Sequence, residues 1–328
     1  MRNLKTAGMA LIFALIHTAA IAQPAGTPIL PALSSGFVAW GDWSFAYAVG
    51  DDNEEGLMLM DVRWKGVKVL HKASMPVIRV KYRGDGTSLG SGCGPWADQI
   101  DWGAIETLND VPTKVIMRIW GNHLEVAVYA EIGGYFLWQA YVFRTGDAAL
   151  FPKLYSAGWS CGQSGSKKDH KHHPYWRLDF DVEDHLNEVW QLNTTSNPNE
   201  IMIGRFDAEG SSQRTSSQPN KWWRVGKPGS SKSVKVEIIS NELRDQAGSP
   251  WFEFSRRDAS VRRYHADEDE GWDFGAKGNL GYADPAESLT GARDIIFWGI
   301  GHLSHFWTAA DQANPHWHER TMAIRPNW

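Results

Sequence analysis

Short apolar segments recur along this chain, separated by clusters of turn-forming residues. Residues 56–64 alternate and then turn at Lys65-Gly66 into 67–70, which predicts a β-hairpin. Four further segments rich in Val, Ile and aromatic residues are predicted strands: 75–82, 114–120, 123–130 and 136–143. Turn clusters separate them at the spacing of a β-sandwich, and no long amphipathic helix interrupts the series. The sequence therefore predicts an all-β chain folded as one large antiparallel β-sandwich.

The first residues are typical of a secretory signal peptide. Basic residues precede an apolar stretch from Ala7 to Ile16, and a small-residue cleavage pattern follows at Ala20-Ile21-Ala22. The apolar stretch is shorter than the roughly 20 residues that a transmembrane helix needs, which disfavours the alternative of an uncleaved membrane anchor. We therefore expect a signal peptide over 1–22, a single sandwich domain over 23–328, and a periplasmic or secreted mature protein.

Charge and composition narrow the classes of partner. The net charge is −5 with both signs interspersed, and no basic tract is longer than Lys167-Lys168, which argues against nucleic acid or an anionic membrane as a partner. Cys93 and Cys161 are the two cysteines, and an oxidising compartment would allow a disulfide between them. The 18 tryptophans suit either packed β layers or sugar-binding faces. The Ser- and Gly-rich stretch 210–232 is interpreted as a long surface loop or insertion.

A histidine-rich segment carries the strongest indication of chemistry. In an extended strand, His170 and His172 project from the same face, because side chains alternate with a period of two. Two imidazoles on one face form a bidentate platform for a metal such as Cu(II) or Zn(II). The alternative is an exposed loop, since Lys167, Lys168 and Lys171 surround the pair.

The string from His170 to Val182 resembles the signature of copper amine oxidases, in which His-x-His is followed after four residues by Arg-Leu-Asp. Here Arg177-Leu178-Asp179 stands at that spacing. Residues 294–298 are similar to the start of the family's segment that leads to a third copper ligand. This match places that ligand at His305, whereas the spacing of His302 does not fit the family pattern.

Further segments extend the resemblance from about Trp40 to the C-terminus. Residues 55–62, 69–74 and 221–225 are similar to parts of the family's catalytic domain. The resemblance implies a short, divergent copper amine oxidase with a β-sandwich fold, and it suggests a homodimer. The implied copper(II) ligands are His170, His172 and His305. Three imidazoles and a water form the nitrogen-rich tetragonal site that Cu(II) favours.

A group of aspartates lies close to these histidines in the sequence. Asp179 and Asp181 are two residues apart, and Asp294 begins the segment that carries His305. The family has a structural metal site in this arrangement, so the resemblance implies a calcium site, and carboxylates are the ligands that Ca²⁺ prefers. The alternative is that these residues are ordinary surface aspartates at strand ends.

The family also makes an organic cofactor, topaquinone, from a tyrosine in a Thr-x-x-Asn-Tyr-(Asp/Glu) motif. Tyr135 occupies the matching position and is the implied precursor. Glu131, Gly134 and Phe136 replace the Thr, the Asn and the acid of the motif, so no amide side chain flanks the ring to hold its orientation. The alternative is that Tyr135 is a packed tyrosine of the sandwich.

Amine oxidation also needs a base that removes a proton from the bound substrate. The family's aspartate lies in a region that is shortened here, where Asp85 is a candidate and Asp98 and Asp101 are weaker ones. The sequence leaves the base unassigned.

Three interpretations of function follow. The first is an enzyme that oxidises a small-molecule primary amine to an aldehyde, with release of ammonia and hydrogen peroxide, through a quinone derived from Tyr135. The second is a copper-binding relative that has lost quinone chemistry. The third is a binding module without a metal, in which tryptophan-rich faces contact sugars or a partner protein. The three histidines favour the first two.

Overall fold

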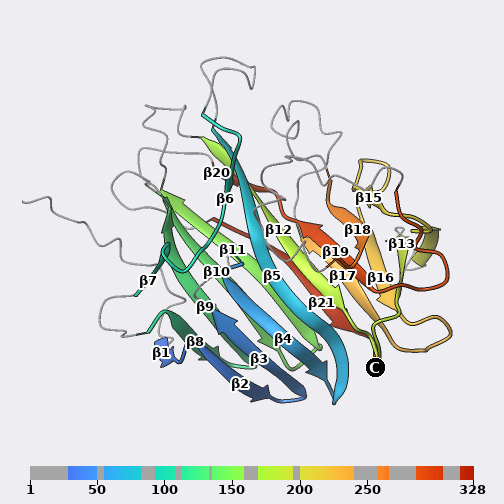
Figure 1. The fold of residues 1–328 in the computed structure, drawn as a ribbon, viewed down its shortest axis with the longest axis horizontal. Coiled ribbons are helices and arrows are strands. Elements are labelled where there is room, and N and C mark those ends of the chain that lie inside the picture. Colours follow the sequence, from blue (N-terminus) through green and yellow to red (C-terminus); the bar gives the residue numbers. More distant parts are fainter. Residues whose placement is uncertain are drawn as a thin grey trace, which may run out of the picture.

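The computed structural model describes residues 29–49, 55–82, 93–107, 113–132, 135–158, 169–194, 200–239, 257–265, 286–305 and 318–328. The regular structure in these ranges is entirely β-strand, arranged in two large antiparallel sheets (Figure 1). The predicted all-β class and large antiparallel architecture are therefore confirmed. Within the same ranges, no helix has the length and apolarity that a membrane span requires. The expected signal peptide, Asp85 and Cys161 lie outside the described residues, whereas Cys93 is described and is disulfide-bonded.

The 11-stranded sheet runs in the order β1-β8-β9-β10-β11-β21-β17-β16-β13-β14, and β7 pairs with β9 off this path. Its strands are β1 (Ile29–Ala32), β7 (Ile105–Glu106), β8 (Val115–Trp120), β9 (His123–Ile132), β10 (Tyr135–Arg144), β11 (Ala149–Gly158), β13 (Glu188–Thr194), β14 (Glu200–Arg205), β16 (Lys221–Gly226), β17 (Ser233–Ile239) and β21 (His318–Pro326).

The 10-stranded sheet runs in the order β15-β18-β19-β12-β5-β4-β3-β2, with β20 paired to β12 and β6 paired to β5. Its strands are β2 (Ser35–Trp40), β3 (Trp43–Val49), β4 (Leu57–Trp64), β5 (Val67–Tyr82), β6 (Trp96–Asp98), β12 (His170–Phe180), β15 (Gly210–Ser212), β18 (Ala259–Arg263), β19 (Ile295–Ile300) and β20 (Leu303–His305). In both sheets, strands from distant parts of the sequence lie side by side.

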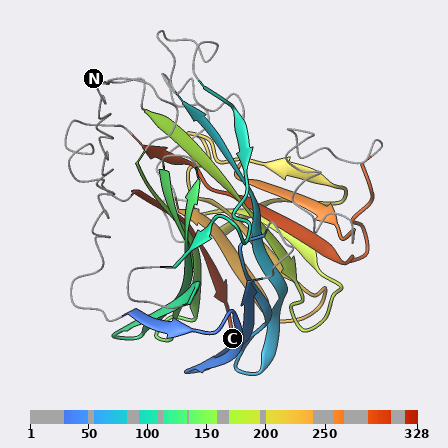
Figure 2. The same cartoon turned by 60° about the vertical axis from the view of Figure 1, so that its left-hand side comes forward.

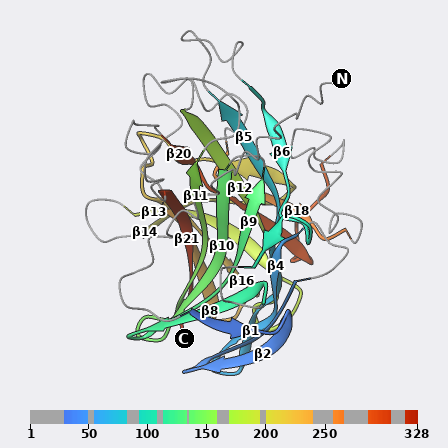
Figure 3. The same ribbon diagram turned by 90° about the vertical axis from the view of Figure 1, so that its left-hand side faces the viewer.

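The main core forms where the inner faces of the two sheets meet, as the turned views of Figures 2 and 3 show. β3 illustrates the sequence pattern behind it, because its residues alternate between buried and half-buried along the whole strand. Aromatic pairs join the sheets: Phe45 stacks on Phe143 with ring centroids 4.0 Å apart, and Tyr141 meets the ring of Trp176 edge-on at 5.4 Å. Many of the tryptophans are therefore core residues of packed β layers.

The chain end closes one end of the sandwich. The indole Nε1 of Trp64, beside the turn between β4 and β5, donates a hydrogen bond to the carbonyl of Trp328. The Trp328 indole donates in return to the carbonyl of Trp64. This exchange ties the last strand of one sheet to a hairpin of the other.

The predicted strands correspond closely to observed ones, with one error. The hairpin of 56–64 and 67–70 corresponds to β4 and the start of β5, although β5 continues to Tyr82 without a break and so includes the predicted strand 75–82. The interpretation of 210–232 as a surface loop is wrong for part of its length, because β15 and β16 lie within it. Trp222 and Trp223 of β16 are buried, and this apolar pair outweighs the polar composition of the flanking residues.

Replacement of Phe143 by alanine should destabilise the fold by about 3–5 kcal/mol, because it removes a fully buried ring that stacks across the two sheets. Phe37→Ala is the control, since that ring is 70% exposed and its loss should change the free energy of unfolding by no more than about 0.5 kcal/mol. Denaturant unfolding of both variants measures the difference, and equal effects would contradict the proposed core.

Candidate functional site

β12 lies inside the 10-stranded sheet and every one of its residues is buried. β5 pairs with it along one edge, and β19 and β20 pair in sequence along the other. Such a strand has neighbours on both edges and covered faces above and below, so its polar side chains must find partners within the protein. The alternative interpretation of the histidine-rich segment as an exposed loop is therefore wrong.

The structure brings the three histidines of the implied copper site together. His170 and His172 lie on β12, two residues apart, with ring centroids separated by 4.8 Å. His305 ends β20 directly opposite His170, and the centroids of these two rings are 4.6 Å apart. None of the three rings is more than 3% exposed. A strand pair thus gathers imidazoles that are far apart in the sequence.

The environment of these rings keeps at least one of them neutral. Burial, and to a lesser extent the charge of His305, lowers the pKa of His172 to about 3. A neutral imidazole is the form that binds a metal, because the ligand nitrogen must offer its lone pair. Three buried imidazoles with this electrostatic setting fit the donor set that Cu(II) or Zn(II) takes.

Aromatic rings enclose His170 from the side of β5. Tyr82, the cross-strand partner of His170, stacks on its ring with centroids 4.5 Å apart and an interplanar angle of 25°. The ring of Trp96 on β6 contacts Tyr82 edge-on, with the two ring centroids 6.0 Å apart. Tyr82 is fully buried, so the imidazole of His170 is held by packing on one side. Tyr82 belongs to no sequence motif that would mark it as part of the site.

The three aspartates of the implied calcium site also lie together. Asp179, Asp181 and Asp294 each offer a carboxylate oxygen, and these oxygens lie within 4.8 Å of one another. Asp179 and Asp181 are buried and Asp294 is half-buried, so the alternative of ordinary surface aspartates does not describe them. Three close carboxylates are a suitable ligand set for a hard divalent cation.

Charges of both signs lie close to these aspartates. The Lys68 ammonium lies 3.1 Å from Asp181 and neutralises part of the cluster. Burial, followed by the negative charge of Asp181, raises the pKa of Asp294 above its usual range. A bound cation would relieve this repulsion, because it stabilises the ionised form of all three side chains.

For the candidate cofactor residue and the candidate bases, the structure gives backbone pairing and a few contacts. Tyr135 begins β10 in the 11-stranded sheet, where its backbone pairs with Ile132 and Gly158; its side chain is not among those described. Asp98 lies on β6 opposite Ile78, one strand removed from β12. Asp101 accepts a hydrogen bond from the backbone N–H of Ala104 in a turn. Neither aspartate is brought to the histidines by these contacts.

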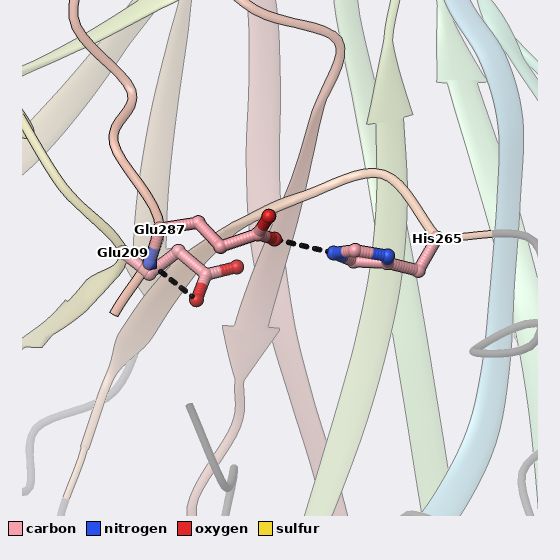
Figure 4. Close-up of side chains that lie close together, drawn as sticks. All are labelled: Glu209, His265 and Glu287. Atoms are coloured by element: carbon pink, nitrogen blue, oxygen red, sulfur yellow. Dashed lines mark hydrogen bonds and ion pairs between the residues drawn. The ribbon is translucent and has the colours of Figure 1, made fainter. Parts of the chain in front are cut away.

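A second group of potential ligands was missed by the sequence analysis. Glu209, His265 and Glu287 offer donor atoms within 4.8 Å of one another (Figure 4). His265 Nε2 lies 2.5 Å from Glu287, and the Glu209 carboxylate accepts hydrogen bonds from the backbone N–H groups of Glu287 and Arg263. No spacing rule connects the three residues. Glu209 and His265 flank the paired strands β15 and β18, and Glu287 lies beside Glu209 at the bridge between Ala208 and Ser288. The hydrogen bonds among these residues connect the segments that carry them.

No family model matches the sequence, and no curated protein matches it. Solved structures do match the fold. The Aspergillus nidulans amine oxidase is similar with a TM-score of 0.62 and 15% identity over 98% of this chain and 55% of that one. A copper-containing benzylamine oxidase from Hansenula polymorpha gives a TM-score of 0.58 and 15% identity over 90% of this chain and 60% of that one. The Pichia pastoris lysyl oxidase gives a TM-score of 0.58 and 13% identity over 88% of this chain and 51% of that one.

This chain therefore spans only about half to three-fifths of the length of these neighbours. At such low identity the likeness concerns the fold. The described residues form the two-sheet β architecture seen in amine oxidases that include a copper-containing one.

Proposed function

We propose that this chain is a copper-dependent oxidase that resembles primary-amine oxidases. The observation that carries the proposal is the meeting of three buried imidazoles, His170 and His172 from β12 and His305 from β20. The fold shared with amine oxidases supports it independently, because the comparison does not depend on these residues alone. The proposed substrate is a small-molecule primary amine, and the products are an aldehyde, ammonia and hydrogen peroxide.

In this proposal the protein positions the metal and the cofactor and provides the environment around them. The three histidines hold Cu(II), and Tyr135 is the precursor of topaquinone. When bound, copper and topaquinone supply the redox chemistry that converts the amine and O₂ into products. The burial of β12 surrounds the histidines with protein, while the Tyr82 ring packs on His170 and holds its orientation. Asp179, Asp181 and Asp294 hold Ca²⁺ beside the same strand as a structural site.

A second candidate function has an observation in its favour. Glu131, Gly134 and Phe136 stand where the family motif has Thr, Asn and an acid, although His170, His172 and His305 match its copper ligands. A copper-binding relative that has lost quinone formation and amine oxidase activity would show this combination. The two candidates share the metal centre and differ in the fate of Tyr135.

The cellular setting belongs to the same proposal. Residues 1–22 have the pattern of a signal peptide, which supports a periplasmic or secreted protein. The family resemblance supports a homodimer. Neither feature is needed for the copper centre itself.

The first prediction concerns copper. His172→Ala should weaken Cu(II) binding by more than the roughly 10–100-fold that is typical of changes to the partners of a ligand, because it removes a ligand outright. His123→Ala is the matched control, since that ring lies on β9 and stacks on Trp120. Metal analysis and copper titration of both variants measure the effect. Unchanged copper binding in His172→Ala would contradict the proposed centre.

The second prediction concerns calcium. With copper held constant, Ca²⁺ should stabilise the protein by about 2.7 kcal/mol at a concentration 100 times its dissociation constant, because it binds the folded state. Asp294→Asn should abolish most of this effect, whereas Asp207→Asn should preserve it, since the Asp207 side chain is 63% exposed and outside the cluster. Thermal unfolding with and without a calcium chelator is the measurement. If the chelator does not change the melting temperature of the unmodified protein, the proposed calcium site is wrong.

The third prediction separates the two candidate functions. Copper-loaded, aerated protein should acquire a visible quinone band and a gain of mass on the peptide that contains Tyr135. Tyr135→Phe should abolish both, and Tyr129→Phe, on the adjacent strand β9, should leave both intact. Absorption spectra and peptide mass spectrometry report the outcome. If copper binds and the band never forms, the oxidase proposal fails and the copper-binding relative is the correct function.

A further inference from the structure

A chain of buried polar side chains lies on the face of β12 opposite to His172. His173 follows His172 directly and therefore projects from the other face of the strand. Its Nδ1 lies 2.7 Å from Nδ1 of His302, and Nε2 of His302 lies 3.2 Å from the carboxylate of Asp258. Arg214 completes the group, with its Nη2 3.0 Å from the same carboxylate. All four residues are more than nine-tenths buried.

The direction of the bonds to Asp258 follows from chemistry. An ionised carboxylate only accepts hydrogen bonds, so the backbone N–H and guanidinium of Arg214 donate to it, and Nε2 of His302 donates to it as well. Burial alone would raise the pKa of Asp258, but the bond from His302 and the nearby positive charges outweigh burial and hold that pKa below its usual range. One proton lies between the Nδ1 atoms of His302 and His173, and the hydrogen bond that it makes joins the two rings.

These contacts connect the segments that carry the candidate copper ligands. His173 is the neighbour of His172 in the chain, and His302 stands three residues before His305. Asp258 precedes β18, and its backbone carbonyl also accepts a hydrogen bond from the N–H of Ile300 at 2.8 Å. The turn between β19 and β20 is thus bound to Asp258 through both the main chain and a side chain. The Gly301 N–H bonds in addition to the carbonyl of Pro174 on β12.

β20 is a short strand whose residues are all buried. The strand contains three residues, and within the described part of the chain it is paired with β12, through His305, Ser304 and Leu303. A strand of this length makes few ladder bonds, so its position depends on the contacts that flank it. The buried bond between His302 and His173 is such a contact, and it joins the same two strands that supply the metal ligands.

We propose that Asp258, His302 and His173 are positioning residues that clamp β20 onto β12 and so set His305 at the correct place relative to His170 and His172. The inference rests on the proposed copper centre and deepens it. The clamp acts on the geometry of the site from the opposite face of the strand. None of its three residues is a copper ligand in this account.

The test compares two clamp variants with the unmodified chain and with a control. His302→Leu removes both side-chain bonds, and Asp258→Asn keeps the size of the side chain but removes its charge. Glu125→Gln is the control, because Glu125 is a fully buried carboxylate paired with Arg118 in the other sheet. For each protein, thermal unfolding is measured without metal, and Cu(II) affinity and the electron paramagnetic resonance spectrum are measured with metal.

His302→Leu should bind Cu(II) roughly tenfold more weakly and show altered hyperfine splitting, since a displaced His305 changes the ligand field. Asp258→Asn should change both quantities in the same direction by less. Glu125→Gln should lower the melting temperature without any change in affinity or spectrum, which separates positioning from general destabilisation. If His302→Leu does not fold, Asp258→Asn decides the matter.

The two proposals can fail separately. Wild-type affinity and spectrum in the clamp variants, together with loss of copper from His172→Ala, would overturn the clamp and leave the copper centre intact. Unchanged copper binding in His172→Ala would show instead that the metal site itself is misplaced.

Discussion

The complete burial of β12 is the constraint on which the rest of the structure depends. This strand carries histidines, a lysine, an arginine and an aspartate, yet every one of its residues is buried. A buried polar group without a partner costs about 1–3 kcal/mol, and a buried charge costs more. Its neighbours must therefore supply polar partners. The histidine site, the aspartate cluster and the buried clamp all lie along this strand for that reason.

The period of the strand keeps these groups separate. His170 and His172 share one face, whereas His173 lies on the other and bonds to His302. Two imidazole clusters can therefore use neighbouring residues of one strand and still have separate roles. One can hold a metal, and the other can hold the strands that carry the ligands. A one-residue shift of β20 along β12 would exchange the faces on which His302 and His305 lie.

Sequence reasoning could find what depends on local pattern. Alternation predicted β4, and the enrichment in Val, Ile and aromatic residues predicted β8, β9 and β10. The resemblance to the copper amine oxidase signature pointed to the histidine and aspartate groups that the structure brings together. It failed where tertiary packing decides the outcome. Polar composition concealed β15 and β16, because the burial of Trp222 and Trp223 is set by strands far away in the sequence.

The clamp could not be found by pattern for a similar reason. His302 was set aside because its spacing does not fit the copper ligands, and Arg214 and Asp258 are isolated residues 44 positions apart. Only the pairing of β15 with β18 and of β19 with β12 brings them to His173. The signal available in the sequence was a pair of extra histidines, His173 and His302, each next to or near a proposed ligand.

The most direct test of the copper centre is a crystal structure of the copper-loaded protein, with anomalous scattering recorded at the copper edge. The proposed centre predicts one strong peak between His170, His172 and His305, with imidazole nitrogens about 2 Å from the ion. A peak elsewhere, such as at Glu209, His265 and Glu287, or the absence of a peak near His170 in protein shown to contain copper, would contradict it.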